Sequence, residues 1–180
     1  MEKNDSDLLA EFRLVYPAWR EGALPFLEAA DWKQAFTEYP FLRFETIPWA
    51  PLKKPLAQCR VAILSTAGVY VKGDQPPFDA ENFEGDWRFR EVPIDMDKEQ
   101  LAIAHTHYPH RHAEQDLNVV LPLQRLKALQ AEGVIGELAP MALSISGYCL
   151  QPDMIAEHSI PAMVARLQAM ETDVLLHIPV

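Results

Sequence analysis

Apolar residues in the centre of the chain predict the strands of a buried sheet. Within residues 60–71, Val61 to Leu64 form a continuous apolar run, which is typical of a strand covered on both faces. Residues 101–107, 142–148 and 173–178 have the composition of three further strands. In the strand predicted for 101–107, the period of two places His105 and His107 on one face.

Helical spacing and breaker residues predict the segments between these strands. Residues 7–38 indicate two amphipathic helices, the first ending at Pro17. A further helix begins at Pro122 and stops at Gly133, and another spans 152–169 with a break near residues 159–161. Prolines and aromatics in residues 39–56 predict an extended arm, and residues 74–90 an ordered loop over the sheet edge.

The alternation of strands and helices favours an α/β fold. We expect three layers, a mainly parallel sheet with helices on both faces, and an N-terminal helical extension. Residues 1–58 would hold the N-terminal helices and the proline-aromatic arm and residues 59–180 the α/β domain, together one compact unit. The polar start of the chain and the lack of an apolar run near ~20 residues predict a cytoplasmic protein, neither exported nor inserted in a membrane.

Charge and cysteine content narrow the classes of partner and site. The net charge of -10 and a pI near 5.0 disfavour a nucleic-acid partner, because such a surface repels phosphates. The two cysteines, Cys59 and Cys149, form no CxxC pair, so neither a disulfide framework nor a zinc knuckle is predicted. Both are expected to be buried thiols, although Cys149 follows a predicted strand and could instead be a catalytic thiol.

The densest group of candidate ligands is the segment HTHYPHRH. Its imidazoles could converge on a divalent metal, with Asp116 as a further ligand. The four histidines are His105, His107, His110 and His112. The spacing is similar to the HxHxDH motif of metallo-β-lactamase-type hydrolases, but Pro109 stands in place of the Asp. A metal-dependent hydrolase is therefore one candidate, and a polar loop edge hydrogen-bonded to the backbone and to Asp116 is the alternative.

A second candidate site lies at the end of the first predicted strand. A strand that runs into a turn of small residues places backbone amides at the carboxyl edge of an open sheet, where ligands usually bind. The residues predicted to bind substrate are Ser65, Thr66, Gly68, Asp116, Asn118 and Arg125. Arg125 could hold an anionic group, or could simply be exposed on its helix.

Several sequence blocks in fixed order resemble a known family. WAPLKKPLAQCRVAILSTAGVY, KGDQPPFD, HTHYPHRHAEQDLNVVLPLQRLKAL and GVIGELAP, spanning residues 49–180, are similar to the selenoprotein B family of glycine, sarcosine, betaine and D-proline reductases. The resemblance implies a cytoplasmic α/β reductase subunit that acts on a small amine or amino acid. It also implies other reductase subunits, or further copies of the chain, as partners. In such enzymes a selenocysteine or cysteine attacks a substrate carbon and expels an amine, and dithiols then restore the selenol or thiol.

One feature of the family is missing from the sequence. The resemblance implies a cysteine or selenocysteine motif after a strand like residues 173–180, whereas this sequence stops at Val180 and neither cysteine occupies the matching position. We expect one of three causes: a UGA selenocysteine codon read as a stop, a shortened chain, or a natural short form. In the last case the chain would be a non-catalytic binding or assembly subunit, with residues 39–56 as its docking surface.

Overall fold

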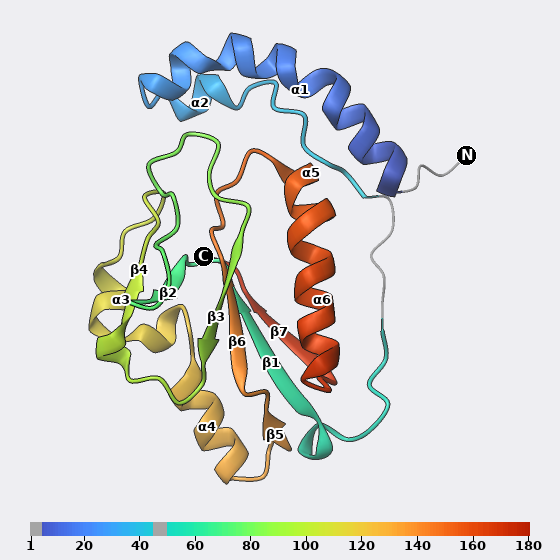
Figure 1. Cartoon of the computed structure of the whole chain (residues 1–180), viewed down its shortest axis with the longest axis vertical. Helices are drawn as coiled ribbons and strands as arrows, with labels where there is room; N and C mark the ends of the chain where they lie inside the picture. The colour runs from blue at the N-terminus through green and yellow to red at the C-terminus, as the bar shows by residue number, and fades with distance from the viewer. Residues whose placement is uncertain (1–4, 45–49) are drawn as a thin grey trace. The chain divides into compact units, whose positions relative to one another are not determined.

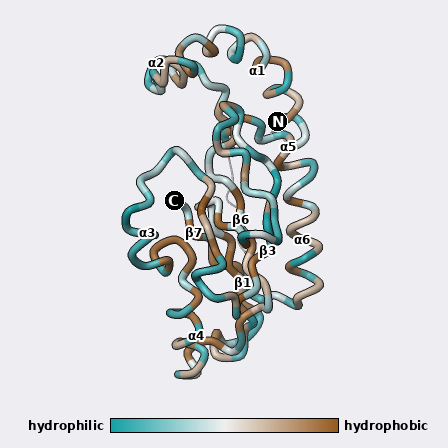
Figure 2. Tube along the Cα trace, turned by 60° about the vertical axis from the view of Figure 1, so that its left-hand side comes forward, coloured by the Kyte–Doolittle hydropathy of each residue, from teal (hydrophilic) through white to brown (hydrophobic). Residues whose placement is uncertain are grey.

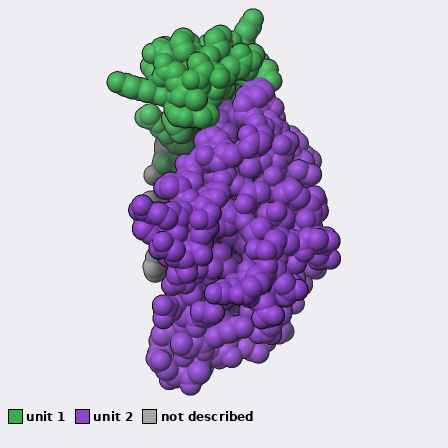
Figure 3. Space-filling model, turned by 90° about the vertical axis from the view of Figure 1, so that its left-hand side faces the viewer, with its two compact units in different colours: residues 1–50 green, residues 51–180 purple. Residues whose placement is uncertain are grey.

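The computed structural model describes residues 5–44 and 50–180. Their contacts divide the chain into two compact units, Met1–Ala50 and Pro51–Val180, which Figure 3 colours separately. No helix within the described ranges is long and apolar enough to cross a membrane.

The first unit is helical. Helix α1 spans Asp5–Glu28, and the short helix α2, Trp32–Ala35, begins after Asp31, whose side chain accepts a hydrogen bond from the amide of Gln34. A group of aromatic rings packs between these helices and the segment after them, namely Phe12, Tyr16, Trp19, Phe36, Tyr39 and Phe41. Of the predicted arm 39–56, residues 45–49 lie outside the described part of the chain.

The predicted helix end at Pro17 is wrong. Helix α1 continues past both Pro17 and Pro25 without interruption. A proline inside a helix removes one hydrogen bond to the carbonyl four residues earlier, here that of Arg13 or Glu21. Because both prolines and both of these residues are exposed, water can reach the helix where those bonds are missing.

The second unit is built on a mixed, mostly parallel sheet, which confirms the predicted α/β class (Figure 1). Its strands are β1 (Arg60–Ser65), β3 (Phe89–Pro93), β5 (Glu137–Leu138), β6 (Met141–Ile145) and β7 (Val174–Ile178). Strand β1 pairs in parallel with β5, β6 and β7, and only β3 runs antiparallel, beside β6. Strands β3 and β5 were not expected from the sequence.

Strand β1 is central in this sheet. Val61 pairs with Leu138 of β5 and also with Val174 of β7, so these two neighbours lie on opposite edges of β1. Ser65 likewise pairs with both β6 and β7. Strands β5 and β6 therefore share one edge of β1, and β7 occupies the other. This position explains the unbroken apolar run of β1, which is buried on both faces.

A small antiparallel sheet follows β1, which ends at Ser65 in the small-residue turn that the sequence predicted. After Gly68, which has a positive φ of 70°, the chain resumes as β2 (Val69–Val71). Its partner β4 is only Leu101–Ile103. The prediction that residues 104–107 continue this strand is wrong, because the ladder ends where Ala104 donates to the carbonyl of Gly68. His105 and His107 therefore lie in a turn instead of sharing a strand face.

Helices cover both faces of the main sheet, as predicted. Figure 2 shows α6 (Ile160–Ala169) on one side and α3 (Arg111–Gln115) and α4 (Leu123–Ala131) on the other. Three short 3-10 turns, Leu56–Gln58, Lys98–Gln100 and Leu117–Val119, connect the elements. The core on the α3 and α4 face joins both sheets through Val61, Ile63, Val69, Val92, Leu101, Leu121, Leu126 and Ala142.

The helix predicted for 152–169 is present, but it is not broken near residues 159–161 and instead contains a π-helical turn. A short α-helical start, α5 (Pro152–Met154), runs into a π-helical turn over Ile155–Ser159 before α6 begins. Pro161 has no amide hydrogen to offer the carbonyl of Glu157, which favours a wider turn at this point. Within the turn, Ser159 donates a hydrogen bond to the carbonyl of Trp87.

Candidate functional site at the carboxyl edge of the sheet

Thr66 joins the ends of three parallel strands. Its amide donates to the carbonyl of Ile178 at 3.1 Å, and its carbonyl accepts from the amide of Gly147 at 2.8 Å. Its hydroxyl accepts from the amide of Val180 at 2.8 Å. The carboxyl ends of β1, β6 and β7 thus meet at one largely buried threonine, at the edge where open α/β sheets bind ligands.

The backbone amides of the turn after β1 are not free for a ligand, as the sequence had suggested, but already form hydrogen bonds. The amide of Ala67 donates to the hydroxyl of Ser65, and the amide of Gly68 to the carbonyl of Ile145. The Ser65 hydroxyl in turn donates to the carbonyl of Val120 at 2.7 Å. With these amides and the Ser65 hydroxyl already paired, a ligand at this edge would contact side chains in place of a nest of free backbone N–H groups.

Gly68 lets the chain before β2 lie close to the chain after β4. A Cβ built at this position would lie 2.5 Å from the carbonyl oxygen of Ala104, and the residue has a positive φ. Both conditions exclude a side chain here. Gly68 therefore fixes the turn that leads into His105.

His105 is a buried, neutral histidine. Only 6% of the residue is exposed, and its Nδ1 accepts a hydrogen bond from the amide of His107 at 3.1 Å. Burial lowers the pKa of His105 to about 4, with a further contribution from the neighbouring His107 and His110. The proton of the neutral ring must then sit on Nε2, which has no hydrogen-bond partner within the described residues.

The imidazoles of the histidine segment contact tyrosine rings as well as one another, with His105 edge-on to His107 at 5.8 Å between centroids. The ring of Tyr108 contacts both His105, at 4.9 Å between centroids, and His110, at 4.7 Å. Its hydroxyl donates to the carbonyl of Ala67, and burial raises its pKa to about 12. His107 instead stacks on Tyr148 at 3.7 Å. Among the described residues no three His, Cys, Asp or Glu side chains form a metal-binding group, and metal binding by the four histidines, His112 included, stays a prediction.

Asp116 and Asn118 stabilise the start of α4. Asp116 accepts hydrogen bonds from the amide and the side chain of Asn118, and the Asn118 side-chain oxygen accepts from the amides of Gln124 and Arg125. The bonds from Asn118 lower the pKa of Asp116. The Arg125 guanidinium lies 3.7 Å from Asp116 and is 74% exposed, so the ion pair between them is weak.

The same two residues line a groove of about 640 Å³. One wall consists of residues from the 94–103 segment and the other of residues from the 110–127 segment, including His110. The hydrogen bond from Ser65 to Val120 connects this second wall to the turn after β1. The predicted substrate-binding residues thus fall in two adjoining places, with Ser65, Thr66 and Gly68 at the sheet edge and Asp116 and Asn118 in the groove.

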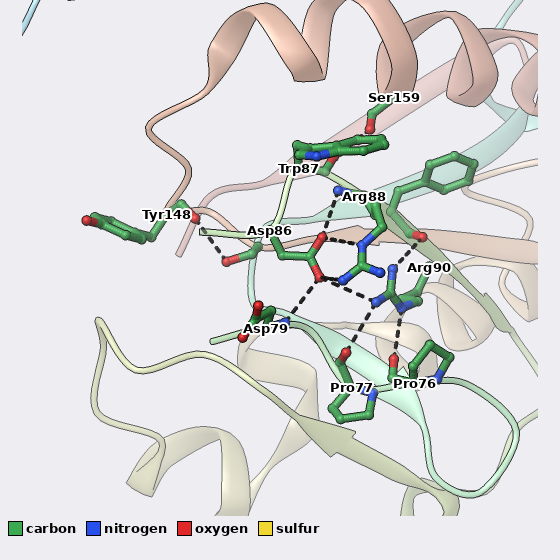
Figure 4. Close-up of polar contacts among 11 residues, drawn as sticks. Pro76, Pro77, Asp79, Asp86, Trp87, Arg88, Arg90, Tyr148 and Ser159 are labelled. Atoms are coloured by element: carbon green, nitrogen blue, oxygen red, sulfur yellow. Dashed lines mark hydrogen bonds and ion pairs between the residues drawn. The ribbon is translucent and has the colours of Figure 1, made fainter. Parts of the chain in front are cut away.

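An ion-pair network that the sequence analysis missed fixes the loop beside the sheet edge (Figure 4). Asp86 contacts Arg88 at 2.7 Å and Arg90 at 3.5 Å, and Arg90 donates to the carbonyls of Pro76 and Pro77. Burial alone would raise the pKa of Asp86, but hydrogen bonds from Arg88 and from the amide of Asp79 lower it below its usual value. The alternation D-x-R-x-R was the available signal, but sequence alone does not show that Asp86 and Arg90 are buried.

Neither cysteine is a ready nucleophile. Burial raises the pKa of the Cys149 thiol to about 11, so this thiol is protonated at neutral pH. The Cys59 thiol is buried and donates to backbone carbonyls at Lys54 and Pro55. Only the thiolate form attacks carbon or disulfide sulfur, so the described residues supply no activated thiol.

The open, mostly parallel sheet makes this an α/β protein, and sequence comparison gives the family. The profile described as "Glycine/sarcosine/betaine reductase selenoprotein B" matches residues 26–175. The chain belongs to this family, as the sequence blocks predicted.

Individual relatives carry names of reductase subunits. D-proline reductase subunit gamma of Acetoanaerobium sticklandii is 28% identical over 71% of this chain and 51% of its own length. Sarcosine reductase complex component B subunit beta of Peptoclostridium acidaminophilum is 32% identical over 62% of the chain and 26% of its own length. Glycine reductase complex component B subunit gamma of Symbiobacterium thermophilum is 30% identical over 57% of the chain and 24% of its own length.

The chain therefore spans about half the length of the first relative and about a quarter of the other two. No solved structure matches it significantly.

Proposed function

We propose that this chain is the substrate-holding part of a selenoprotein B type reductase and that it acts together with other reductase subunits. The observation that carries the proposal is the family match over residues 26–175, which includes the ends of β1 and β6 and the whole histidine segment. The ligand would be a small amine or amino acid. Thr66 would contact it at the sheet edge, where Ser65 and Gly68 shape the turn, and Asp116 and Asn118 would contact it in the groove, with Arg125 beside Asp116.

The reductive step would use a thiol or selenol outside the described residues, because Cys149 is protonated and Cys59 is buried. In the net reaction a carbon–nitrogen bond breaks and the carbon gains a hydrogen. The nitrogen takes up the second hydrogen and leaves as the free amine. A dithiol loses two electrons and two protons and becomes a disulfide, which balances the reduction of the substrate carbon.

Binding and turnover of defined substrates test this proposal. Calorimetry on the purified chain would use D-proline, glycine, sarcosine, pyrrolidine and methylamine. Mass spectrometry with dithiothreitol as donor would follow the release of the reduced product, with and without the remaining subunits of a related reductase. We expect binding without turnover by the chain alone, and turnover in the assembled complex.

Thr66 variants sharpen the test. Thr66→Ser keeps the hydroxyl, whereas Thr66→Val removes it and should weaken binding about tenfold, the cost of one hydrogen bond to a charged ligand. Thr37→Val, in the first unit, is the matched control. The proposal fails if none of the five compounds binds. It also fails if the chain alone turns over substrate and Cys149→Ser abolishes that activity, because the nucleophile would then lie in this chain.

A further inference from the structure

We infer that the outer edge of β7 and the adjoining flank of α6 bind a β-strand and an α-helix from the part of a selenoprotein B type subunit that lies outside this sequence. The strand would pair in parallel with β7, and the helix would lie beside α6. The inference rests on the proposed function in taking the partner from a reductase, and it assigns the surface that this partner covers.

The outer edge of β7 has unpaired backbone groups. Strand β1 pairs with one edge of β7, and no strand among the described residues pairs with the other. The carbonyl of Ile178 accepts from the amide of Thr66 at the end of β1. By alternation along the strand, the amides and carbonyls of Leu175 and His177 then point away from β1. These groups are available to a further strand.

The opposite edge of the sheet is protected, whereas the edge at β7 is not. Strand β3 ends the sheet on the other side, and the Gln75 side chain donates to its Glu91 carbonyl at 2.7 Å. Strand β3 also contains Arg90 and Pro93. The sequence of β7, VLLHI, has no Asp, Glu, Lys, Arg or Pro. Because proteins protect free strand edges with charges, prolines or covering loops, this apolar edge indicates a surface that a partner covers.

Both faces of β7 expose leucine side chains. Val174 and Ile178 pack against the core on the α3 and α4 face, so Leu176 points to that face and Leu175 to the face of α6. Both leucines are exposed. A strand inside a parallel sheet is instead buried on both faces, as β1 is, because helices cover it. Strand β7 therefore has the composition of an inner strand in the position of an edge strand.

Helix α6 exposes apolar side chains on the flank that faces β7. Its buried Met163 points to the sheet, and Arg166 on one flank donates to Glu91 of β3. At about 100° per residue, Ile160 and Val164 lie on the opposite flank, towards β7, and both are exposed. Among the described residues of the second unit, α6 with the turns before it is the one α-helix on this face (Figure 2). The face of the sheet beside α6 can thus accept a second helix.

A strand and a helix fit this surface better than a second copy of the chain. Two copies would pair their β7 strands antiparallel about a two-fold axis. Each α6 lies towards its own β3, so at least four strands, spanning about 14 Å, would separate the two helices. That gap is wider than a helix of about 10 Å, and the apolar flanks would stay uncovered. A parallel strand brings a crossover helix with it, which would fill the gap.

The relatives contain enough additional chain to supply this unit. About half of D-proline reductase subunit gamma lies outside its match to this chain, and about three quarters of the sarcosine reductase subunit does. The bound strand would also end close to the candidate site, because β7 ends where Ile178 and Val180 bond to Thr66. With strands about 4.8 Å apart, the end of the bound strand would lie about 10 Å from Thr66.

Co-expression and hydrogen exchange test the inference. The chain would be produced alone and together with the part of D-proline reductase subunit gamma outside the match, with cysteine in place of any selenocysteine. In the chain alone we expect the amides of Leu175 and His177 to exchange at least about a hundredfold faster than that of Leu176, which faces β1. In the complex both amides should exchange at least about tenfold more slowly than in the chain alone.

Two substitutions should weaken the complex without removing a bond between β7 and β1. His177→Pro removes an amide that points away from β1, and Val164→Lys places a charge where the second helix would pack. Each should raise the dissociation constant at least about tenfold, measured by dilution of the fluorescently labelled complex. Val134→Lys is the matched control and should have no effect, since Val134 is 46% exposed and Val164 is 44% exposed. Thermal unfolding checks that each variant is folded.

The inference is overturned if no complex forms or if neither substitution weakens it. It is also overturned if the chain alone already protects the amides of Leu175 and His177, by self-association or by another part of the chain. The proposed function fails separately. A complex that forms through β7 but reduces no substrate keeps this surface and removes the function, whereas turnover by a complex that both substitutions leave intact does the reverse.

Discussion

The phenol ring of Tyr148 lies flat against the imidazole of His107, with ring centroids 3.7 Å apart and an interplanar angle of 9°. The stack joins the chain after β6 to the turn after β4. The Tyr148 hydroxyl also donates to the carbonyl of Phe83, which connects the stack to the loop over the sheet edge. Three segments far apart in sequence are thus held beside Thr66 by one aromatic side chain.

The stack should set the ionisation of His107. Burial lowers the pKa of His107, and the burial comes from Tyr148 on one face of its ring, since the residue is otherwise exposed. Tyr148→Ala should therefore raise the pKa of His107 towards its ordinary value, as measured by an NMR titration of the imidazole protons. Tyr148→Phe keeps the ring and should leave the pKa nearly unchanged. Equal pKa values in both variants would contradict this assignment.

His105 should make stability depend on pH. Its pKa is about 4 in the folded protein and 6.5 ordinarily, so the unfolded chain binds the proton more readily. The contribution is complete above pH 6.5 and is lost as the pH falls from 6.5 towards 4. Between pH 7 and pH 5 we expect a loss of about 2 kcal/mol in unfolding free energy, measured with urea.

Two substitutions separate this effect from other titrating groups. His105→Asn keeps an acceptor for the His107 amide and should remove most of the slope with pH between 7 and 5. His112→Gln changes an exposed histidine and should preserve the slope. An unchanged slope in His105→Asn would show that other groups cause the acid sensitivity.

The ion pairs of Asp86 should contribute strongly to stability. Asp86→Asn would leave the buried Arg90 guanidinium without its compensating charge, at a cost of about 3 to 5 kcal/mol. Asp74→Asn, an exposed substitution in the same loop, should change stability by no more than about 0.5 kcal/mol. Urea unfolding of the two variants provides the comparison, and a loss below about 1 kcal/mol for Asp86→Asn would argue against the network.

Gly68 and Gly73 allow backbone strain to be separated from close packing. Both have a positive φ, but an added Cβ at Gly73 meets no atom within 4 Å, whereas at Gly68 it lies 2.5 Å from the Ala104 oxygen. Gly73→Ala should cost about 1 kcal/mol. Gly68→Ala should cost at least about 2 kcal/mol more and shift the NMR signals of His105. Similar unfolding free energies for both variants would mean that the turn can move away from β4.

The strands and helices with a strong hydrophobic pattern could be predicted from the sequence. The pairing of one strand with another could not. The apolar run at Val61 to Leu64 and the Pro122 to Gly133 helix signals correspond to β1 and α4. Strand β3 was missed because its alternating burial depends on antiparallel pairing with β6, which no local pattern encodes. The strand predicted for 101–107 was too long because the sequence does not show that its partner β2 begins only after Gly68.

The candidate site could be predicted only in part, because some of its features depend on contacts between segments distant in the sequence. Thr66 and the histidines could be singled out by residue type, since small residues after an apolar strand and clustered imidazoles are local signals. The stack of His107 on Tyr148 and the contacts of Tyr108 with two histidines arise from the tertiary arrangement. The burial that lowers the pKa of His105 likewise depends on segments distant in the chain.

The central position of β1 has a consequence for how the chain is made. Arg60 pairs with Glu137, and Val61 pairs with Val174, so both neighbours of this strand are synthesised long after it. At ribosomal rates of about 5 to 20 residues per second, the second edge of β1 stays open for roughly 5 to 20 seconds. Throughout that time a strand that is apolar on both faces is available to other nascent chains. The yield of folded protein should therefore depend on protection of residues 60–65 during synthesis as well as on final stability.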